Sequence, residues 1–295
     1  MPKLIRYAPI ALVILLVVAV PAVAGEGMAG IDFRIFTAVV AEFLAPYSVP
    51  EFRYLPASLF LVTPFALLPE TVGFFAWNVL QLLSLLGGLW LIAPNLRAVL
   101  AALILVSPFA GILIYFGQFD GLLVLALGLG YFGVKANDPV RVGLAIALFT
   151  LKPVHVILPS VVLLLLLPSW RLRARAVLIP LALFALSFLI WPTWLPDWIA
   201  VAPYARQTHF LVTKVATIPW RVTGLIRSLL ACGCAIYLVA FRRHPATLLS
   251  TALLVNLLLV TYFNPYSVVL AAPLIATVVD QLAGAGRAAS HHLCG

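Results

Sequence analysis

The amino-acid sequence predicts an all-α protein, a polytopic bundle of transmembrane helices with about 9–11 membrane segments. Three observations lead to this fold class. Of the 295 residues, 64% are hydrophobic and only 9% are charged, whereas soluble domains are about 25% charged. Apolar runs of membrane-spanning length recur along the chain. In lipid every backbone polar group needs an internal partner, so these runs are expected to be helices rather than open strands.

The apolar runs are interpreted by length, because a spanning helix takes about 20 residues. Clear spans are predicted at residues 7–24, 72–92, 98–116, 118–134, 176–195, 222–241 and 264–281. Shorter or interrupted segments are predicted at 55–68, 142–151, 153–168 and 246–260. We interpret residues 1–295 as a single integral membrane domain. The first run resembles a signal peptide, and its length favours an uncleaved signal-anchor.

Charged residues predict the orientation of the segments. Basic residues stand beside apolar runs at Lys3, Arg6, Arg171, Arg173, Arg175, Arg242, Arg243 and Arg287. Such clusters are typical of cytoplasmic loops, and their distribution argues against a nucleic-acid partner despite the net charge of +9. Residues 25–56 lean acidic and are predicted to be an extracytoplasmic loop with an interfacial helix. Residues 196–220 are predicted to be a second such loop, and 282–295 a cytoplasmic tail.

The segment from 142 to 167 is too long for one ordinary span and has basic residues on both flanks. We expect it to enter the membrane, turn at Lys152-Pro153 and return, because Pro153 lacks an N–H and disfavours helix at the residue before it. Broken helices of this kind place polar groups near cavities. A second break at Ser107-Pro108 is an alternative to one crossing over residues 98–116.

Ionisable groups near membrane segments are functional candidates, because burying them is unfavourable. They lie in four places: Asp32, the GQFD stretch with Gln118 and Asp120, Lys152 with His155, and Arg206 with His209. Asp32 can cap a following helix, can act as a general base facing a cavity, or both. Lys152 can extend to the lipid headgroups or hold a phosphate as a point charge. The three cysteines form no metal-binding pattern.

Several motifs in this order resemble glycosyltransferase family 87, a bacterial, α-mannosyltransferase-like family with the GT-C fold. In the first loop they are Asp32-Phe33, Pro46-Tyr47 and Tyr54-Leu55-Pro56. Further along are Gly117-Gln118, Gly143-Leu144, Lys152-Pro153 and the stretch NPYSVVLAAPL at 264–274. The resemblance extends from residue 31 to about 167 and then weakens.

The resemblance implies a membrane enzyme that moves a hexose, mannose in the family's commonest association, from a polyprenyl phosphate to a glycan or glycolipid acceptor with inversion. Asp32 would be the catalytic base. Lys152, with Arg53 and Arg206 as helpers, would bind the donor phosphate. Tyr54, Gln118, Asp120 and His155 would line the substrate pocket. The reaction would need no metal or cofactor and would take place at the extracytoplasmic face of a bacterial inner membrane.

Two other functions are compatible with the sequence. A lipid or solute transporter would also need broken helices and intramembrane polar groups, although it would usually contain related halves, and we find no repeat. A non-catalytic scaffold that binds polyprenyl phosphate is suggested by a second half shorter than is usual in the family. Loss of sugar transfer in Asp32→Asn would favour the enzyme. Transport or lipid binding that survives this substitution would favour one of the two alternatives.

Overall fold

The computed structural model describes residues 29–49, 51–201, 244–259 and 265–293. Within these ranges every regular element is a helix, which confirms the all-α fold class. The elements are α2 (Ile31–Ala41), η1 (Pro46–Ser48), α3 (Ala57–Ala66), α4 (Glu70–Ile92), α5 (Leu96–Phe116), α6 (Asp120–Ala136), α7 (Pro139–Phe149), η2 (Pro153–His155), α8 (Ile157–Leu166), α9 (Trp170–Ile190), α10 (Trp194–Val201), α14 (Pro245–Leu259), η3 (Pro265–Ala271) and α15 (Ala272–Leu293).

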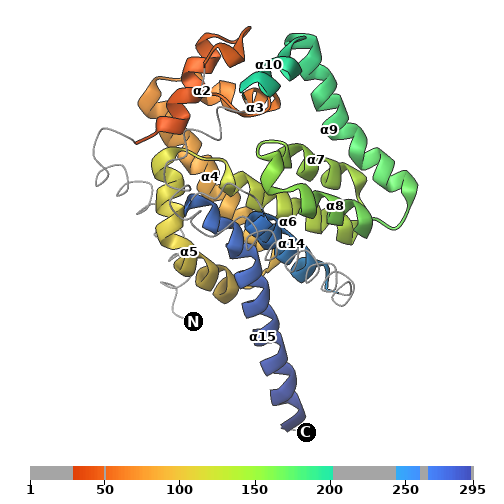
Figure 1. Ribbon diagram of the computed structural model, residues 1–295. Helices are drawn as coiled ribbons and strands as arrows, with labels where there is room; N and C mark the ends of the chain where they lie inside the picture. The colour runs from red at the N-terminus through yellow and green to blue at the C-terminus, as the bar shows by residue number, and fades with distance from the viewer. Residues whose placement is uncertain (1–28, 50, 202–243, 260–264, 294–295) are drawn as a thin grey trace, which may run out of the picture.

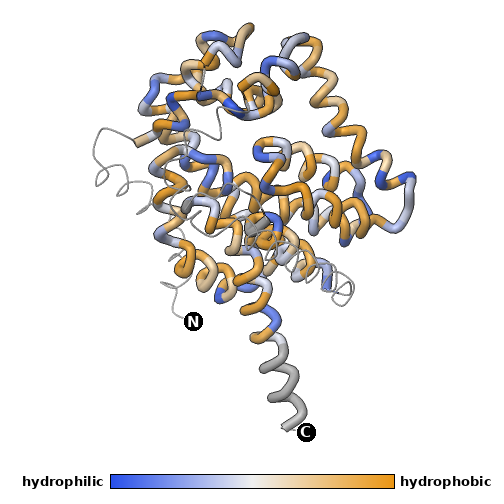
Figure 2. The backbone as a smooth tube through the Cα atoms, viewed as in Figure 1, coloured by the Kyte–Doolittle hydropathy of each residue, from blue (hydrophilic) through white to orange (hydrophobic). Residues whose placement is uncertain are grey.

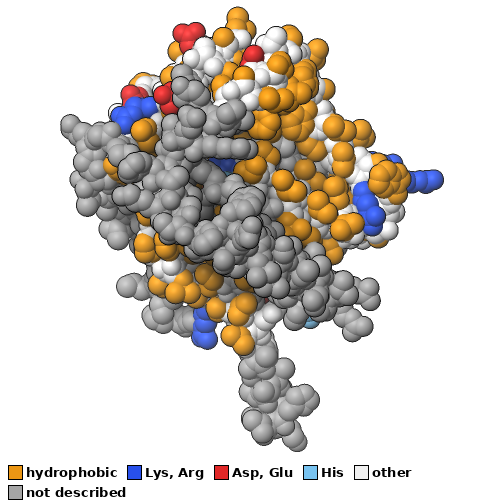
Figure 3. All heavy atoms as spheres, viewed as in Figure 1, with side chains coloured by type: hydrophobic (Ala, Val, Ile, Leu, Met, Phe, Trp, Pro, Cys, Tyr) orange, Lys and Arg blue, Asp and Glu red, His pale blue; other side chains and the backbone are white. Residues whose placement is uncertain are grey.

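Among the described residues, four helices are long and apolar enough to cross a membrane. They are α4, α5, α9 and the helical stretch Tyr266–Gly284. Hydrophobic residues run along most of α5 and α9 in Figure 2, and Figure 3 shows a broad hydrophobic surface over α9. Exposed apolar surface of this extent is typical of a lipid-facing helix. The protein is therefore a membrane protein, as predicted. The predicted spans 7–24 and 222–241 lie outside the described residues.

Local sequence signals explain where several helices begin. Asn95 caps α5 by accepting a hydrogen bond from the backbone N–H of Arg97 at 3.0 Å. Asp138 caps α7 in the same way and is followed by Pro139 at the first helical position, where a missing N–H has no consequence. The alternative of a break at Ser107-Pro108 is wrong, because α5 continues as one helix through Pro108.

The predicted break at Lys152-Pro153 is confirmed. α7 ends at Phe149, the 3-10 turn η2 follows, and α8 begins at Ile157. Each arm is about 15 Å long at 1.5 Å per residue, half of the roughly 30 Å hydrocarbon core of a bilayer. Asn256 of α14 stabilises the turn: its side-chain oxygen accepts from the N–H of Leu158, and its amide donates to the carbonyl of Val154, both at 2.7 Å.

The centre of the bundle is the close contact of α4 with α6. A Cβ atom added to Gly121 would lie 2.2 Å from the carbonyl oxygen of Gln81, and one added to Gly88 would lie 2.3 Å from that of Val124. Only glycine permits backbones to approach this closely. The close packing places the first turn of α6, which begins with Asp120, deep inside the protein.

Helix continues into the segments predicted as the second loop and the tail. The predicted loop at 196–220 begins as helix, since α10 continues to Val201. The predicted tail at 282–295 is helical to Leu293, because α15 continues without interruption and extends from the bundle in Figure 1. In that view α2, α3 and α10 lie at the opposite end of the molecule from the far end of α15. Most of the acidic side chains visible in Figure 3 are at this α2 and α10 end.

Candidate active site

The candidate site begins where the start of α2 meets the end of α5. Gly30 and Gly117 both have left-handed backbones, with φ of 70° and 78°, a conformation that glycine adopts without strain. The N–H of Gly30 donates to the carbonyl of Tyr115 at 2.6 Å, which joins the two helix ends. The junction places Asp32, in the first turn of α2, beside Gln118, which follows α5.

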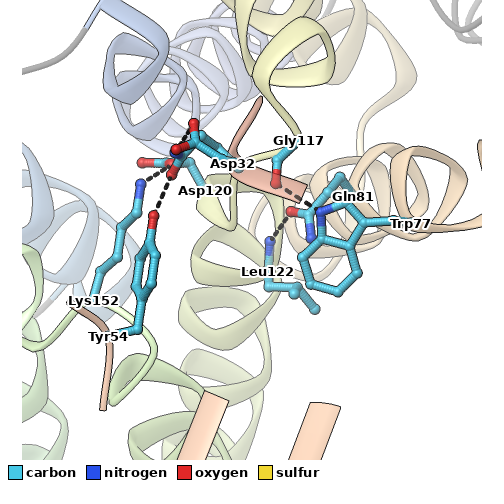
Figure 4. A network of polar contacts seen from close by, with 9 residues as sticks. Asp32, Tyr54, Trp77, Gln81, Gly117, Asp120, Leu122 and Lys152 are labelled. Carbon is cyan, nitrogen blue, oxygen red and sulfur yellow. Dashed lines mark hydrogen bonds and ion pairs between the residues drawn. The ribbon is translucent and has the colours of Figure 1, made fainter. Parts of the chain in front are cut away.

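Asp32 accepts a hydrogen bond from the side-chain amide of Gln118. The interpretation of Asp32 as the helix cap is wrong, because Gly30 occupies the N-cap position and α2 has no side-chain capping bond. Tyr54 donates through its hydroxyl to the oxygen of the same Gln118 amide, at 3.4 Å. Three residues proposed from sequence, Asp32, Tyr54 and Gln118, therefore form one hydrogen-bonded chain. Figure 4 labels its two ends, Asp32 and Tyr54.

The pKa of the Asp32 carboxyl is raised from its ordinary value. The main cause is burial, which removes water from around the charged form. The hydrogen bond from Gln118 and the positive charge of Lys152 act in the opposite direction, while the negative charge of Asp120 raises the pKa further. Asp32 is therefore a carboxylate more basic than usual, as a general base needs to be.

A second group of polar residues lies next to the first. The ammonium of Lys152 donates to a carboxylate oxygen of Asp120 at 2.6 Å. Both side chains are buried, with exposed fractions of 7% for Lys152 and 0% for Asp120. The Lys152 nitrogen also lies 4.6 Å from the centre of the Tyr266 ring, in cation–π geometry. Gln118 and Asp120 are both buried, and each has a polar side-chain partner.

Aromatic rings support both groups. The ring of Phe36 lies 5.2 Å from that of Tyr54 and 4.9 Å from that of Phe119, measured between centroids. Trp77 packs edge-on to Phe119 and donates through its indole N–H to the carbonyl of Gly117 at 2.9 Å. Buried aromatic pairs of this kind hold their neighbours in fixed positions. The cluster thus fixes Tyr54 and the Gly117 junction.

The remaining residues predicted for the site lie outside the Asp32–Gln118–Tyr54 chain and the Lys152–Asp120 pair. His155 is buried in η2, and its backbone N–H donates to the carbonyl of Lys152 at 3.0 Å. Arg53 lies before α3, and its carbonyl accepts a hydrogen bond from the indole of Trp198 at 3.0 Å. Arg206 lies outside the described residues. In the described part of the chain, no group of three or more His, Cys, Asp or Glu residues could hold a metal ion.

Sequence reasoning missed the supporting residues. Gln81 lies inside α4, where its side-chain oxygen accepts from the N–H of Leu122 at 3.3 Å and holds the first turn of α6. Asn256 and Gln81 are buried amides within apolar helices. Because amides are mostly exposed in proteins, an amide within an apolar segment indicates a supporting hydrogen bond, and the sequence contains this signal. Tyr266 stands in the NPYSVVLAAPL stretch, but nothing in that stretch indicates that its ring covers Lys152.

The chain is similar to one described family. A model of glycosyltransferase family 87 matches residues 52–273, a range that includes Gln118, Asp120, Lys152 and Tyr266 and begins after Asp32. Comparison with curated proteins and with solved structures gives no significant match. The family match covers most of the chain and includes the Tyr54-Leu55-Pro56 and Lys152-Pro153 motifs, whereas Asp32-Phe33 and Pro46-Tyr47 lie before the matched range. The protein belongs to glycosyltransferase family 87 and is a membrane-embedded glycosyltransferase.

Proposed function

We propose that this glycosyltransferase moves a hexose, with mannose as the first candidate, from a polyprenyl-phosphate donor to a hydroxyl of a glycan or glycolipid acceptor, with inversion. The observation that carries the proposal is the position of Asp32. Asp32 is half-buried at the start of α2, its carboxylate is held by Gln118, and it is close enough to the Lys152–Asp120 pair for both charges to act on it. A base and a cation therefore lie side by side.

In the proposed reaction Asp32 takes the proton of the acceptor hydroxyl. The hydroxyl oxygen forms a bond to the anomeric carbon, and the bond from that carbon to the phosphate oxygen breaks with its electron pair. The products are the new glycoside, the protonated Asp32 and the polyprenyl phosphate. One carboxylate suffices, because phosphate is a good leaving group and needs no general acid, unlike the leaving groups of glycosidases.

Lys152 is the proposed ligand of the departing phosphate. An ammonium has three donors, and Asp120 uses one of them. The remaining donors can stabilise the negative charge that develops on the phosphate oxygen, an effect that is often the largest in catalysis. Asp120 would keep the buried Lys152 charged before the donor binds. Arg53 and Arg206 remain proposed helpers, and the reaction is proposed to need neither metal nor cofactor.

Tyr54, Gln118, Asp120 and His155 remain the proposed residues of the substrate pocket. Among them Gln118 has the best supported role, because it contacts both Asp32 and Tyr54. It would orient the Asp32 carboxylate toward the acceptor. Tyr54 would position Gln118 from the opposite side.

The site is proposed to face the extracytoplasmic side of a multi-pass protein in a bacterial inner membrane. The acidic character of the α2 and α10 end supports this orientation (Figure 3), as do the basic residues at the start of α9. The lipid tail of the donor would lie in the bilayer beside the bundle, with its headgroup at the level of Asp32.

The test is transfer of radiolabelled mannose from polyprenyl-phosphate-mannose to a mixed glycolipid extract by the protein in liposomes. We expect Asp32→Asn to lower the transfer rate by about 10²–10⁴-fold, the usual contribution of a positioned base. The matched control is Glu42→Gln, which removes an exposed carboxylate at the end of the same helix. This control should transfer mannose at the rate of the unmodified protein.

Other results decide between the alternatives. Equal transfer by Asp32→Asn and the unmodified protein would rule out Asp32 as the base. Donor binding without transfer, for mannose and for other polyprenyl-linked hexoses, would favour a scaffold. Passage of the donor across the liposome membrane that is unaffected by Asp32→Asn would favour a transporter.

A further inference from the structure

A cavity of about 360 Å³ lies outside the Asp32 group, between the loop after α2 and the region around α10. Its walls come from residues 44–48 and from six residues between 191 and 201. The volume is within the range of small-molecule pockets, about 300–1,000 Å³. We propose that this cavity binds a saccharide unit of the acceptor at a distance from the reacting hydroxyl. The inference rests on the proposed function.

The wall of the cavity contains rigid aromatic side chains. Trp191 and Trp194 both line it and are only 2% and 4% exposed. Trp191 is fixed by a hydrogen bond from its indole to the carbonyl of Phe43 at 2.5 Å, and Trp194 packs on Phe188 with ring centroids 5.0 Å apart. Because the rings are almost fully covered, only their small exposed parts form the apolar section of the wall against which the C–H groups of a sugar can pack. Because these rings are already held in place, binding would cost little side-chain entropy.

Polar groups complete the lining. Asp197, in the first turn of α10, is exposed and lines the cavity together with the hydroxyl residues Ser48 and Thr193. A carboxylate accepts hydrogen bonds from neighbouring sugar hydroxyls. Its negative charge disfavours a phosphate, so the donor headgroup is a poor ligand here. The combination of aromatic rings, one carboxylate and two hydroxyl side chains favours a neutral saccharide.

The cavity is connected to the candidate active site through one loop. Tyr47 lines the cavity, and its hydroxyl donates to the carbonyl of Tyr54 at 2.9 Å. Tyr54 in turn contacts Gln118, the partner of Asp32. In the proposal, an acceptor of two or more sugar units places one unit in the cavity while a hydroxyl of another unit reaches Asp32.

Saturation-transfer NMR tests the proposal, because it detects weak binding of sugars to the full chain in lipid nanodiscs. The probes are methyl α-mannoside, methyl β-glucoside and methyl β-galactoside. We expect at least one probe to give a signal above that of empty nanodiscs, and we expect Asp197→Ala to reduce it at least fivefold. Ala200→Trp should do the same by filling the cavity, since Ala200 is an exposed residue of the lining. Glu51→Gln removes an exposed carboxylate outside the lining and should leave the signal unchanged.

The Asp32→Asn variant separates this proposal from the proposed function. It lacks the proposed base and retains the cavity, so sugar binding should persist while transfer is lost. Binding that depends on Asp197 supports the cavity even if the unmodified protein transfers no sugar. Absence of signal with every probe, or a signal that survives both Asp197→Ala and Ala200→Trp, would overturn the proposal while leaving the role of Asp32 intact.

Discussion

The two carboxylates at the centre of the protein, Asp32 and Asp120, have opposite surroundings. Asp32 is partly accessible, and its hydrogen-bond partner is the neutral amide of Gln118. Asp120 is fully buried and forms an ion pair with the ammonium of Lys152. Burial raises the pKa of Asp32, and the hydrogen bond from Gln118 acts against that rise without cancelling it. These different environments support the proposal that Asp32 transfers the proton and that Asp120 supports Lys152.

The largest effect on stability is expected from separating the buried pair. Asp120→Asn leaves the ammonium of Lys152 buried without its anion, and such a change typically costs about 3–5 kcal/mol. We expect a clear fall in the thermal unfolding midpoint in detergent. The double variant Asp120→Leu with Lys152→Met removes both charges and should recover most of the loss.

This experiment also tests the assignment of roles. An Asp120→Asn protein as stable as the unmodified one would contradict the buried ion pair. A folded Asp120→Asn protein without transfer activity, together with an active Asp32→Asn protein, would reverse the roles of the two carboxylates.

A smaller effect, on the pH dependence of transfer, is expected from removing the Gln118 amide that binds Asp32. Hydrogen bonds to charged groups contribute about 1.5–3 kcal/mol, and the bond from Gln118 lowers the pKa of Asp32. Gln118→Leu removes this bond, so the pKa should rise further and a larger fraction of Asp32 should be protonated at a given pH. Because only the ionised form accepts the acceptor proton, the acidic limb of the kcat/KM profile should move to higher pH.

Tyr54→Phe provides the control for this comparison. It removes the hydroxyl that contacts Gln118 and leaves the bond from Gln118 to Asp32 in place. Its acidic limb should therefore stay close to that of the unmodified protein. If the Gln118→Leu profile coincides with the unmodified one, the amide has no influence on proton transfer.

The difference between the two carboxylates could be predicted from the sequence only in part. Apolar length predicts the helices, and Pro153 predicts the break after Lys152, because both signals act within one segment. The partner of Lys152 depends on how α6 and the broken helix pack, and that contact joins residues 32 positions apart. The position of Asp32 depends on the Gly30–Gly117 junction, and the capping rule fails there because a left-handed glycine already begins the helix.

The smallest effect on stability is expected from replacing Tyr266, whose ring covers Lys152. Cation–π contacts contribute about 0.5–2 kcal/mol, more when water is excluded, and the Lys152 nitrogen lies 4.6 Å from the centre of the Tyr266 ring. Tyr266→Leu removes the ring, whereas Tyr266→Phe keeps it. We expect the leucine variant to be less stable than the phenylalanine variant by about 0.5–2 kcal/mol.

A double-mutant cycle isolates the interaction from simple packing. In a Lys152→Met background there is no cation, so the difference between leucine and phenylalanine at position 266 should shrink to the packing term alone. An unchanged difference would mean that the ring of Tyr266 only fills space. A reduced difference would mean that Lys152 is held from two sides, by the carboxylate of Asp120 and by the face of Tyr266, while Asp32 is held by one amide. The cation would then be fixed before the donor arrives, with the base beside it still accessible to the acceptor.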